Sequence, residues 1–199
     1  MLSNRLAKHF GAAAAAAVVV GSANAAIVTW NVNQVVPNNI DGLYVNVETQ
    51  STGSAAAVVA GWDLNPYGTS TTAMSWFGST GGGCVTGLGQ GGTSVAVASL
   101  SSGTLVSAAS TFSNTASSVT AGGWVLNANN FFGFRFVGAD SAVRYGYGVM
   151  AIGANMGTRT LVSLSYESTA GQGINVGAVP APGAIALLGL AGLAGRRRR

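Results

Sequence analysis

Apolar and polar residues alternate along several short stretches of the chain. In residues 131–136, Phe132, Phe134 and Phe136 share one face of the pattern, and Arg135 lies on the other. A period of two is typical of a strand that buries one face. The sequence therefore predicts strands at the four stretches with the clearest alternation, which are 43–49, 131–136, 143–150 and 160–166.

The alternation also predicts which side chains share a face. Tyr145 and Tyr147 are expected on one face of their strand and Gly146 on the other, and Val162 and Leu164 are expected on a common face. Weaker patterns predict further strands at 26–34, 55–62, 73–77, 94–100, 104–106 and 123–127. Many short strands separated by turns indicate an all-β fold, an antiparallel β-sandwich or jelly roll that forms a single domain.

Composition agrees with a sheet protein that has many turns. The chain of 199 residues contains 30 glycines, which weaken helix interiors, and only 7% of its residues are charged. Residues 62–68, around Pro66, are predicted to form a turn, and the glycine-rich residues 78–93 a flexible loop.

The N-terminus has the three-part layout of a secretory signal peptide. A basic start precedes an apolar run at 11–20, and Ala23 and Ala25 form a small-x-small site, so cleavage is expected before Ala26. The alternative is an uncleaved anchor helix, but the apolar run is shorter than the roughly 20 residues that a span requires. Residues 1–25 are therefore expected to be removed.

The loss of the signal peptide limits the chemistry that remains. His9 is the only histidine, and after cleavage the chain contains neither histidine nor lysine. That excludes histidine-based triads, histidine-ligated zinc and Schiff-base chemistry. The five acids show neither calcium-loop spacing nor an evident catalytic pair. We therefore expect a non-enzymatic protein with no catalytic residue, no metal and no cofactor.

Charge and cysteine content exclude further classes. The net charge of +4 comes from the two ends, because the three arginines and five acids between residues 26 and 195 leave −2. No basic patch is present to neutralise phosphates, so a nucleic-acid partner is not expected. Cys84 is the only cysteine, which rules out an intrachain disulfide, and it is expected to be a small residue in the glycine-rich loop.

The C-terminus combines prolines, a short apolar run and a basic end. Pro180 and Pro182 precede the continuously apolar residues 183–195. As a helix these would be about 20 Å long, against a hydrocarbon core of about 30 Å. The basic residues that follow, expected on the cytoplasmic side, are Arg196, Arg197, Arg198 and Arg199.

This tail resembles the PEP-CTERM sorting segment, in which a Val-Pro-x-Pro signature, a short hydrophobic helix and an arginine cluster follow one another. Val179, Pro180 and Pro182 match the signature, and Ala181 stands where the family most often has glutamate. Family members are exported by Gram-negative bacteria, processed by the membrane enzyme exosortase and associated with exopolysaccharide and biofilm production. The resemblance implies export, transient insertion in the inner membrane and delivery to the cell surface or beyond, with an exosortase and the export machinery as partners. It leaves the exosortase subtype open.

The resemblance extends upstream into the body of the chain. Residues 131–136, 143–150 and 164–180 are similar to the C-terminal half of many PEP-CTERM proteins, with Tyr147 where tryptophan is usual. This similarity concerns architecture and carries over no catalytic residue. The expected organisation is a signal helix at 1–25, a β-sandwich domain at 26–167, a linker at 168–178 and a sorting segment with a short hydrophobic helix at 179–199.

Aromatic residues supply the one candidate binding site in the body. Side chains that could stack on sugars if exposed are Trp62, Tyr67, Trp76, Phe77 and Trp124, although aromatic residues at strand spacing are more often core residues. Residues 62–68 combine aromatic and polar side chains, so the candidate glycan contacts are Trp62, Asp63, Asn65 and Tyr67. An exposed aromatic row there would favour carbohydrate binding.

Three functions follow from these observations. The first is a structural or adhesive component of an exopolysaccharide or biofilm matrix. The second is a lectin-like carbohydrate-binding module on the same fold. A secreted hydrolase is the weakest alternative, because it would need two facing carboxylates in a cleft.

Overall fold

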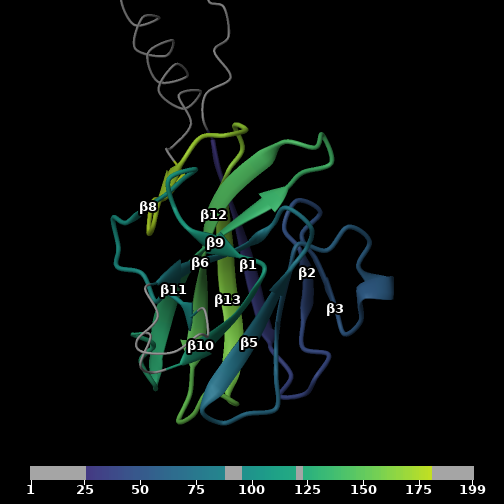
Figure 1. The fold of residues 1–199 in the computed structure, drawn as a ribbon, viewed down its shortest axis with the longest axis vertical. Helices are drawn as coiled ribbons and strands as arrows, with labels where there is room; N and C mark the ends of the chain where they lie inside the picture. Colours follow the sequence, from purple (N-terminus) through teal and green to yellow (C-terminus); the bar gives the residue numbers. More distant parts are fainter. Residues whose placement is uncertain (1–25, 88–95, 120–122, 181–199) are drawn as a thin grey trace, which may run out of the picture.

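A computed structural model of the chain describes residues 26–87, 96–119 and 123–180 (Figure 1). Nearly all of the regular structure in these residues is β. The strands are β1 (Ile27–Val35), β2 (Tyr44–Asn46), β3 (Ser51–Gly53), β4 (Leu64–Tyr67), β5 (Ala73–Gly78), β6 (Gly83–Gly87), β7 (Ala96–Val97), β8 (Leu105–Val106), β9 (Phe112–Ser113), β10 (Thr115–Val119), β11 (Ala128–Val137), β12 (Val143–Ile152), β13 (Arg159–Glu167) and β14 (Ile174–Asn175), and a short 3-10 helix, η1, spans Ala56–Val58. The prediction of an all-β fold is confirmed.

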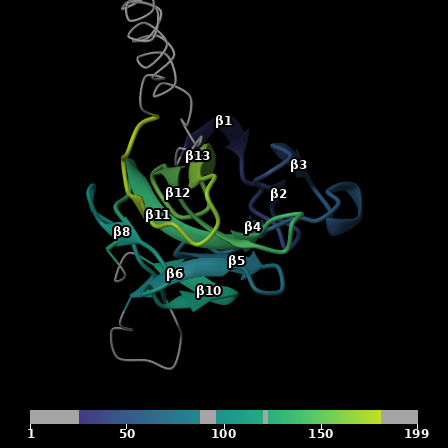
Figure 2. The ribbon, with the colours of Figure 1, turned by 90° about the horizontal axis from the view of Figure 1, so that it is seen from above.

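Twelve of these strands form one continuous, curled sheet. Its order is β1-β13-β12-β11-β6-β7-β10-β5-β4-β2-β3, with β9 paired to β6, and β14 and β8 form a separate pair. Neighbours are antiparallel except for β10 and β7. Figure 2 shows the sheet wrapping around, so that a first half (β1, β13, β12 and β11) faces a second half (β10, β5, β4, β2 and β3).

The core lies between the two halves. Phe132, Phe134 and Phe136 on β11 are fully buried, which confirms the face predicted for them, and Arg135 points away over the ring of Phe112. Trp76 on β5 packs against Phe132 with ring centroids 4.6 Å apart, joining the two halves. Burial of such large apolar side chains is the main stabilising term for a domain of this size.

Glycines on β12 make room for the phenylalanine rings. Gly146 and Gly148 pair with Phe134 and Phe132 across the β11–β12 ladder, and each ring lies over the bare backbone of its partner. The alternation of tyrosine and glycine on β12 therefore has a packing reason, because one face must be free of side chains while the other carries Tyr145.

Replacing Gly146 by alanine is expected to lower the free energy of unfolding by about 1–3 kcal/mol. The added Cβ would meet the ring of Phe134 and lie 2.6 Å from the carbonyl oxygen of Ser165. Urea unfolding measures the effect. Combining Gly146→Ala with Phe134→Leu is expected to cost less than the sum of the two single changes, because the smaller side chain relieves the collision. Strict additivity would contradict this explanation.

A second apolar cluster covers the outer face of β12. Tyr145 and Tyr147 pack there against Val106 of β8 and Ile174 of β14. The Tyr147 hydroxyl donates a hydrogen bond to the carbonyl of Ala178 at 2.6 Å. The segment 168–178, expected as a linker, is thus held against the body and contains β14.

Two predicted strands are wrong. Residues 55–62 instead form η1 and turns, in which Val58 is exposed and Val59 is buried. Residues 123–127 form a turn that buries Trp124, whose indole N–H donates to a backbone carbonyl at 2.8 Å. In each segment one buried apolar side chain, Val59 or Trp124, holds an irregular backbone in place. A short run of apolar residues of this kind cannot be distinguished from a strand by its pattern alone.

Two segments predicted as turn or loop contain strands. Within 62–68, β4 includes Pro66, whose carbonyl accepts a hydrogen bond from the N–H of Leu43 at 3.0 Å. Within 78–93, β6 approaches the backbone of Ser113 so closely at Gly83 that a side chain there would collide with it. Proline and glycine indicated turns, but Pro66 lies in a strand that pairs with β5, and Gly83 permits a close approach of two backbones.

A β-bulge changes the faces of β13. Its register against β12 shifts between Val149 and Met150, which makes Val162 the extra residue. Leu161 and Leu164 consequently both lie in the core. The prediction that Val162 and Leu164 share a face is therefore wrong, because strict alternation makes no allowance for a bulge.

The ends of the described chain leave the body together. The start of β1 and the segment after β14 lie at the same end (Figure 1), and the Ser168 N–H donates to the carbonyl of Ala26 at 3.0 Å. The predicted signal helix at 1–25, with Ala23 and Ala25, lies outside the described residues, as do the residues from 181 onward. The part of the chain that is described has no helix long and apolar enough to cross a membrane.

Candidate functional site

The register of β2, β4 and β5 brings several aromatic residues to one outer face. Trp76 of β5 points into the core, so its neighbour Phe77 points outward and is 43% exposed. Asn65 pairs directly with Phe77, and Tyr67 lies two residues further along β4 on the same face. Tyr44 projects from β2 beside them, because the next residue of its strand is buried in the core.

Three rings form a continuous aromatic ridge, defined here as Tyr44, Trp62 and Phe77. The rings of Trp62 and Tyr44 meet edge to face, with centroids 5.1 Å apart and an interplanar angle of 81°. The rings of Trp62 and Phe77 are tilted by 35° at 5.6 Å. Such contacts fix the orientation of each ring. The ridge is therefore a preformed apolar surface.

A hollow lies on each side of Phe77. The first hollow, of about 250 Å³, is lined by Ile40, Tyr44, Asn65, Tyr67 and Phe77. The second hollow, of about 340 Å³, is lined by Trp62, Phe77, Ser79, Thr80 and Asn114 together with two glycines. Among the described residues, no charged side chain lines either hollow.

Asn65 supplies a fixed polar group in the first hollow. Its side chain is 3% exposed, and its amide Nδ2 donates to the carbonyl of Asp41 at 2.8 Å. That bond orients the amide and leaves Oδ1 without a hydrogen-bond partner among the described residues. A buried acceptor without a partner costs free energy, and because Oδ1 is closed off from solvent, a ligand donor reaches it only if the side chain or its surroundings shift.

Asp63, a predicted glycan contact, has a structural role instead. It is 3% exposed, and its carboxylate accepts a hydrogen bond from the N–H of Val47 at 2.8 Å. Burial raises its pKa from 3.8 to about 6, with a smaller contribution from the nearby charge of Glu48. Of the predicted contact residues, Trp62, Asn65 and Tyr67 thus lie at the surface hollows, whereas Asp63 holds the backbone behind them.

The raised pKa of Asp63 predicts a pH dependence of stability. The folded protein holds this proton more tightly than the unfolded chain, so the contribution is complete below pH 3.8 and is lost as the pH rises through about 6. Asp63→Asn keeps an acceptor for Val47 and carries no charge. We expect it to remove this fall and to raise stability at neutral pH by up to about 3 kcal/mol.

Urea unfolding of Asp63→Asn at several pH values between 4 and 7 measures this difference. Asp41→Asn is the matched control, because Asp41 is exposed in a turn. The control is expected to change stability by less than about 0.5 kcal/mol. If the raised pKa of Asp63 did not cause the pH dependence, the free energies of unfolding of the wild type and Asp63→Asn would change in parallel with pH.

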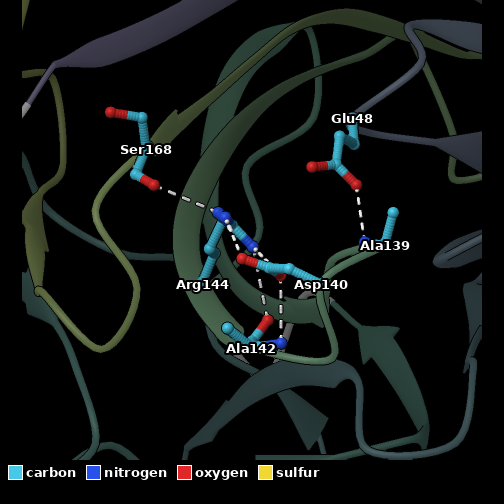
Figure 3. A network of polar contacts seen from close by, with 6 residues as sticks. All are labelled: Glu48, Ala139, Asp140, Ala142, Arg144 and Ser168. Carbon is cyan, nitrogen blue, oxygen red and sulfur yellow. Dashed lines mark hydrogen bonds and ion pairs between the residues drawn. The ribbon is translucent and has the colours of Figure 1, made fainter.

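A separate polar network holds the loops at one end of the body (Figure 3). Arg144 donates two hydrogen bonds to the carboxylate of Asp140, both 2.8 Å, and a third to the carbonyl of Ser168 at 3.1 Å. The N–H of Ala139 donates to Glu48 at 2.8 Å. The network connects the β11–β12 turn to the β2–β3 turn, and Arg144 holds the pKa of Asp140 well below its usual range.

The remaining reactive groups also have structural partners or are buried. Glu167 accepts a hydrogen bond from the N–H of Thr169 at 2.9 Å. Burial raises the pKa of the Cys84 thiol well above its usual range, which makes it unreactive. Within the described ranges, no three histidine, cysteine or acidic side chains lie close enough together to hold a metal ion.

Sequence reasoning located part of this surface. It named Trp62, Asn65, Tyr67 and Phe77, but it missed Tyr44, although this residue lies on the polar face of the alternating stretch 43–49. Comparison with protein-family models, curated proteins and solved structures gave no match. The function of the surface is therefore argued from its chemistry.

Proposed function

We propose that the chain is an exported protein of the cell surface or extracellular matrix, with a structural or adhesive role in an exopolysaccharide or biofilm matrix. The observation that carries this proposal is the aromatic ridge between two uncharged hollows. We describe the body, whose sheet halves pack face to face, as a β-sandwich or jelly-roll-like domain.

The ridge suits a carbohydrate because a sugar ring has an apolar C–H face and a polar rim. Aromatic rings accept the C–H face, and they are already ordered before binding. Neutral amides and hydroxyls beside the rings can bond the rim of hydroxyl groups. Phe77 is exposed, and Tyr44, Trp62 and Tyr67 are partly exposed beside these polar groups, a combination that suits a polysaccharide contact.

A lectin-like module is the second candidate. Polar side chains held in place beside the ridge, such as the Asn65 amide that donates to Asp41, favour recognition of particular hydroxyl groups over general adhesion. We favour a non-enzymatic role because Glu48, Asp63, Asp140 and Glu167 all accept hydrogen bonds that hold the fold. Co-sedimentation of the secreted protein with culture exopolysaccharide tests the matrix role, and a protein that stays in the supernatant would contradict it.

Export and sorting are proposed from the two ends of the chain. An exosortase reads Val179, Pro180 and Pro182 while the apolar segment and the terminal arginines hold the tail in the inner membrane. In support, Val179 is 77% exposed and Pro180 is exposed, directly after the docked Ala178. Val179 and Pro180 are therefore accessible at the end of the described residues.

Mass spectrometry of the secreted protein is expected to show an N-terminus at Ala26 and loss of Arg196 to Arg199. Replacing Pro180 and Pro182 by alanine is expected to leave the unprocessed protein in the inner membrane. Pro37→Ala is the matched control, since this proline lies in the body, and it should be secreted normally. An intact C-terminus in the medium, or unchanged secretion of the double variant, would contradict the sorting proposal.

A further inference from the structure

We propose that the aromatic ridge and its two hollows bind an internal stretch of a linear, uncharged polysaccharide, with neighbouring sugar units in the two hollows. This inference rests on the proposed polysaccharide role and specifies its ligand. It commits the surface to one kind of occupant and to one mode of binding.

The two hollows form one continuous binding surface. Phe77 lines both, and Trp62 and Tyr44 extend the ridge along them. The volume of the first hollow, about 250 Å³, is below the range for pockets that enclose a small molecule, about 300–1,000 Å³, and that of the second, about 340 Å³, is at its lower end. A terminal sugar would use only one hollow, whereas a chain that crosses Phe77 uses both.

The surroundings favour an uncharged chain. No lysine is present in the body, and its three arginines are engaged elsewhere. Arg135 stacks on Phe112, Arg144 binds Asp140, and Arg159 is 2% exposed among backbone carbonyls. An acidic polysaccharide would therefore find no free cation among the described residues of this surface to pair with its carboxylates or sulfates.

Each hollow has neutral groups for sugar hydroxyls. In the first, Tyr44 and Tyr67 supply two hydroxyls. In the second, Ser79, Thr80 and Asn114 supply two hydroxyls and an amide. Hydroxyls and amides both donate and accept, as sugar hydroxyl groups do. The polar groups thus continue along both sides of Phe77.

Calorimetric titration of the secreted protein tests the inference. The probes are glucose, linear gluco-oligosaccharides and manno-oligosaccharides of two, four and six units in several linkages, and oligogalacturonate as the charged counterpart. In at least one neutral series we expect the affinity of the protein to rise about tenfold or more from one to four sugar units. We expect oligogalacturonate to bind no more tightly than the neutral oligosaccharides. If glucose bound as tightly as the tetrasaccharide, or if oligogalacturonate were the preferred ligand, this inference would be overturned but the proposed polysaccharide role would stand. No binding to any glycan would overturn the proposed function as well.

Variants on each side of Phe77 locate the two sugar units. Tyr67→Ala in the first hollow and Asn114→Ala in the second are each expected to lower tetrasaccharide affinity about tenfold, to the level of a shorter chain. Ile40→Ser, at a side chain that is 76% exposed, repeats the first test without risk to the fold. Val125→Ala, outside both hollows, should bind as wild type does. If the variants of one hollow left the dependence of affinity on oligosaccharide length unchanged, binding across both hollows would be contradicted.

Discussion

Replacing Arg159 by methionine is expected to lower the free energy of unfolding by about 3–5 kcal/mol. The guanidinium is 2% exposed, and burial lowers its pKa from the ordinary value. It donates to the carbonyls of Met156 at 3.1 Å, Pro37 at 3.0 Å and Gly68 at 2.6 Å. Methionine fills a similar volume but leaves all three carbonyls without this donor.

These carbonyls belong to three separate loops, which explains the size of the effect. Pro37 follows β1, Gly68 follows β4, and Met156 lies between β12 and β13. Of the residues that line the first hollow, Ile40 lies on the loop of Pro37, and Tyr67 is the last residue of β4, directly before Gly68. Arg159 therefore holds the loops under the binding surface, and the variant should also weaken glycan binding.

Thermal unfolding measures the change, with a melting temperature expected to fall by about 10 °C. Arg135→Met is the matched control, because Arg135 stacks on Phe112 with its guanidinium carbon 4.8 Å from the ring centroid. Loss of that contact should cost about 1 kcal/mol or less. Equal losses in the two variants would show that the backbone hydrogen bonds of Arg159 are not the cause.

Replacing Trp62 and Phe77 together by alanine is expected to lower affinity for a bound polysaccharide about a hundredfold. The two rings lie 5.6 Å apart and form most of the ridge, and Phe77 is the wall shared by both hollows. Their removal takes away both the stacking surface and the boundary between the hollows. The fold should persist, because neither side chain belongs to the main buried core.

Binding is measured by calorimetry, and thermal unfolding confirms that the double variant is folded. The matched control replaces Leu105 and Val125, two apolar residues that are 56% and 57% exposed but lie outside the ridge. The control should bind as the wild type does. Equal losses in both double variants would indicate nonspecific apolar adhesion and not a defined surface.

Alternation located best the strands whose bulky side chains all face one core. The prediction for 131–136 was accurate because Phe132, Phe134 and Phe136 each pack in the same interior. The error at 55–62 arose because only Val59 of its apolar residues is buried. Pairing partners decide such cases, and they cannot be read from a local pattern.

The partly recognised site has a similar explanation. Trp62, Asn65 and Tyr67 are close in sequence, so a local cluster indicated them, whereas Tyr44 and Asn114 arrive from other strands and loops. The inward position of Asp63 depends on a hydrogen bond to Val47, which lies 16 residues away in the chain. Long-range register therefore determined both what was missed and what was misplaced.

Chemical-shift mapping of the secreted, isotope-labelled protein with a neutral oligosaccharide tests the central claim most directly. The account predicts that amide shifts concentrate at residues 40–44, 62–67, 77–80 and around Asn114, on both sides of Phe77. Shifts gathered instead around β8 and β14, or an unchanged spectrum with every glycan, would contradict a polysaccharide-binding surface at the aromatic ridge.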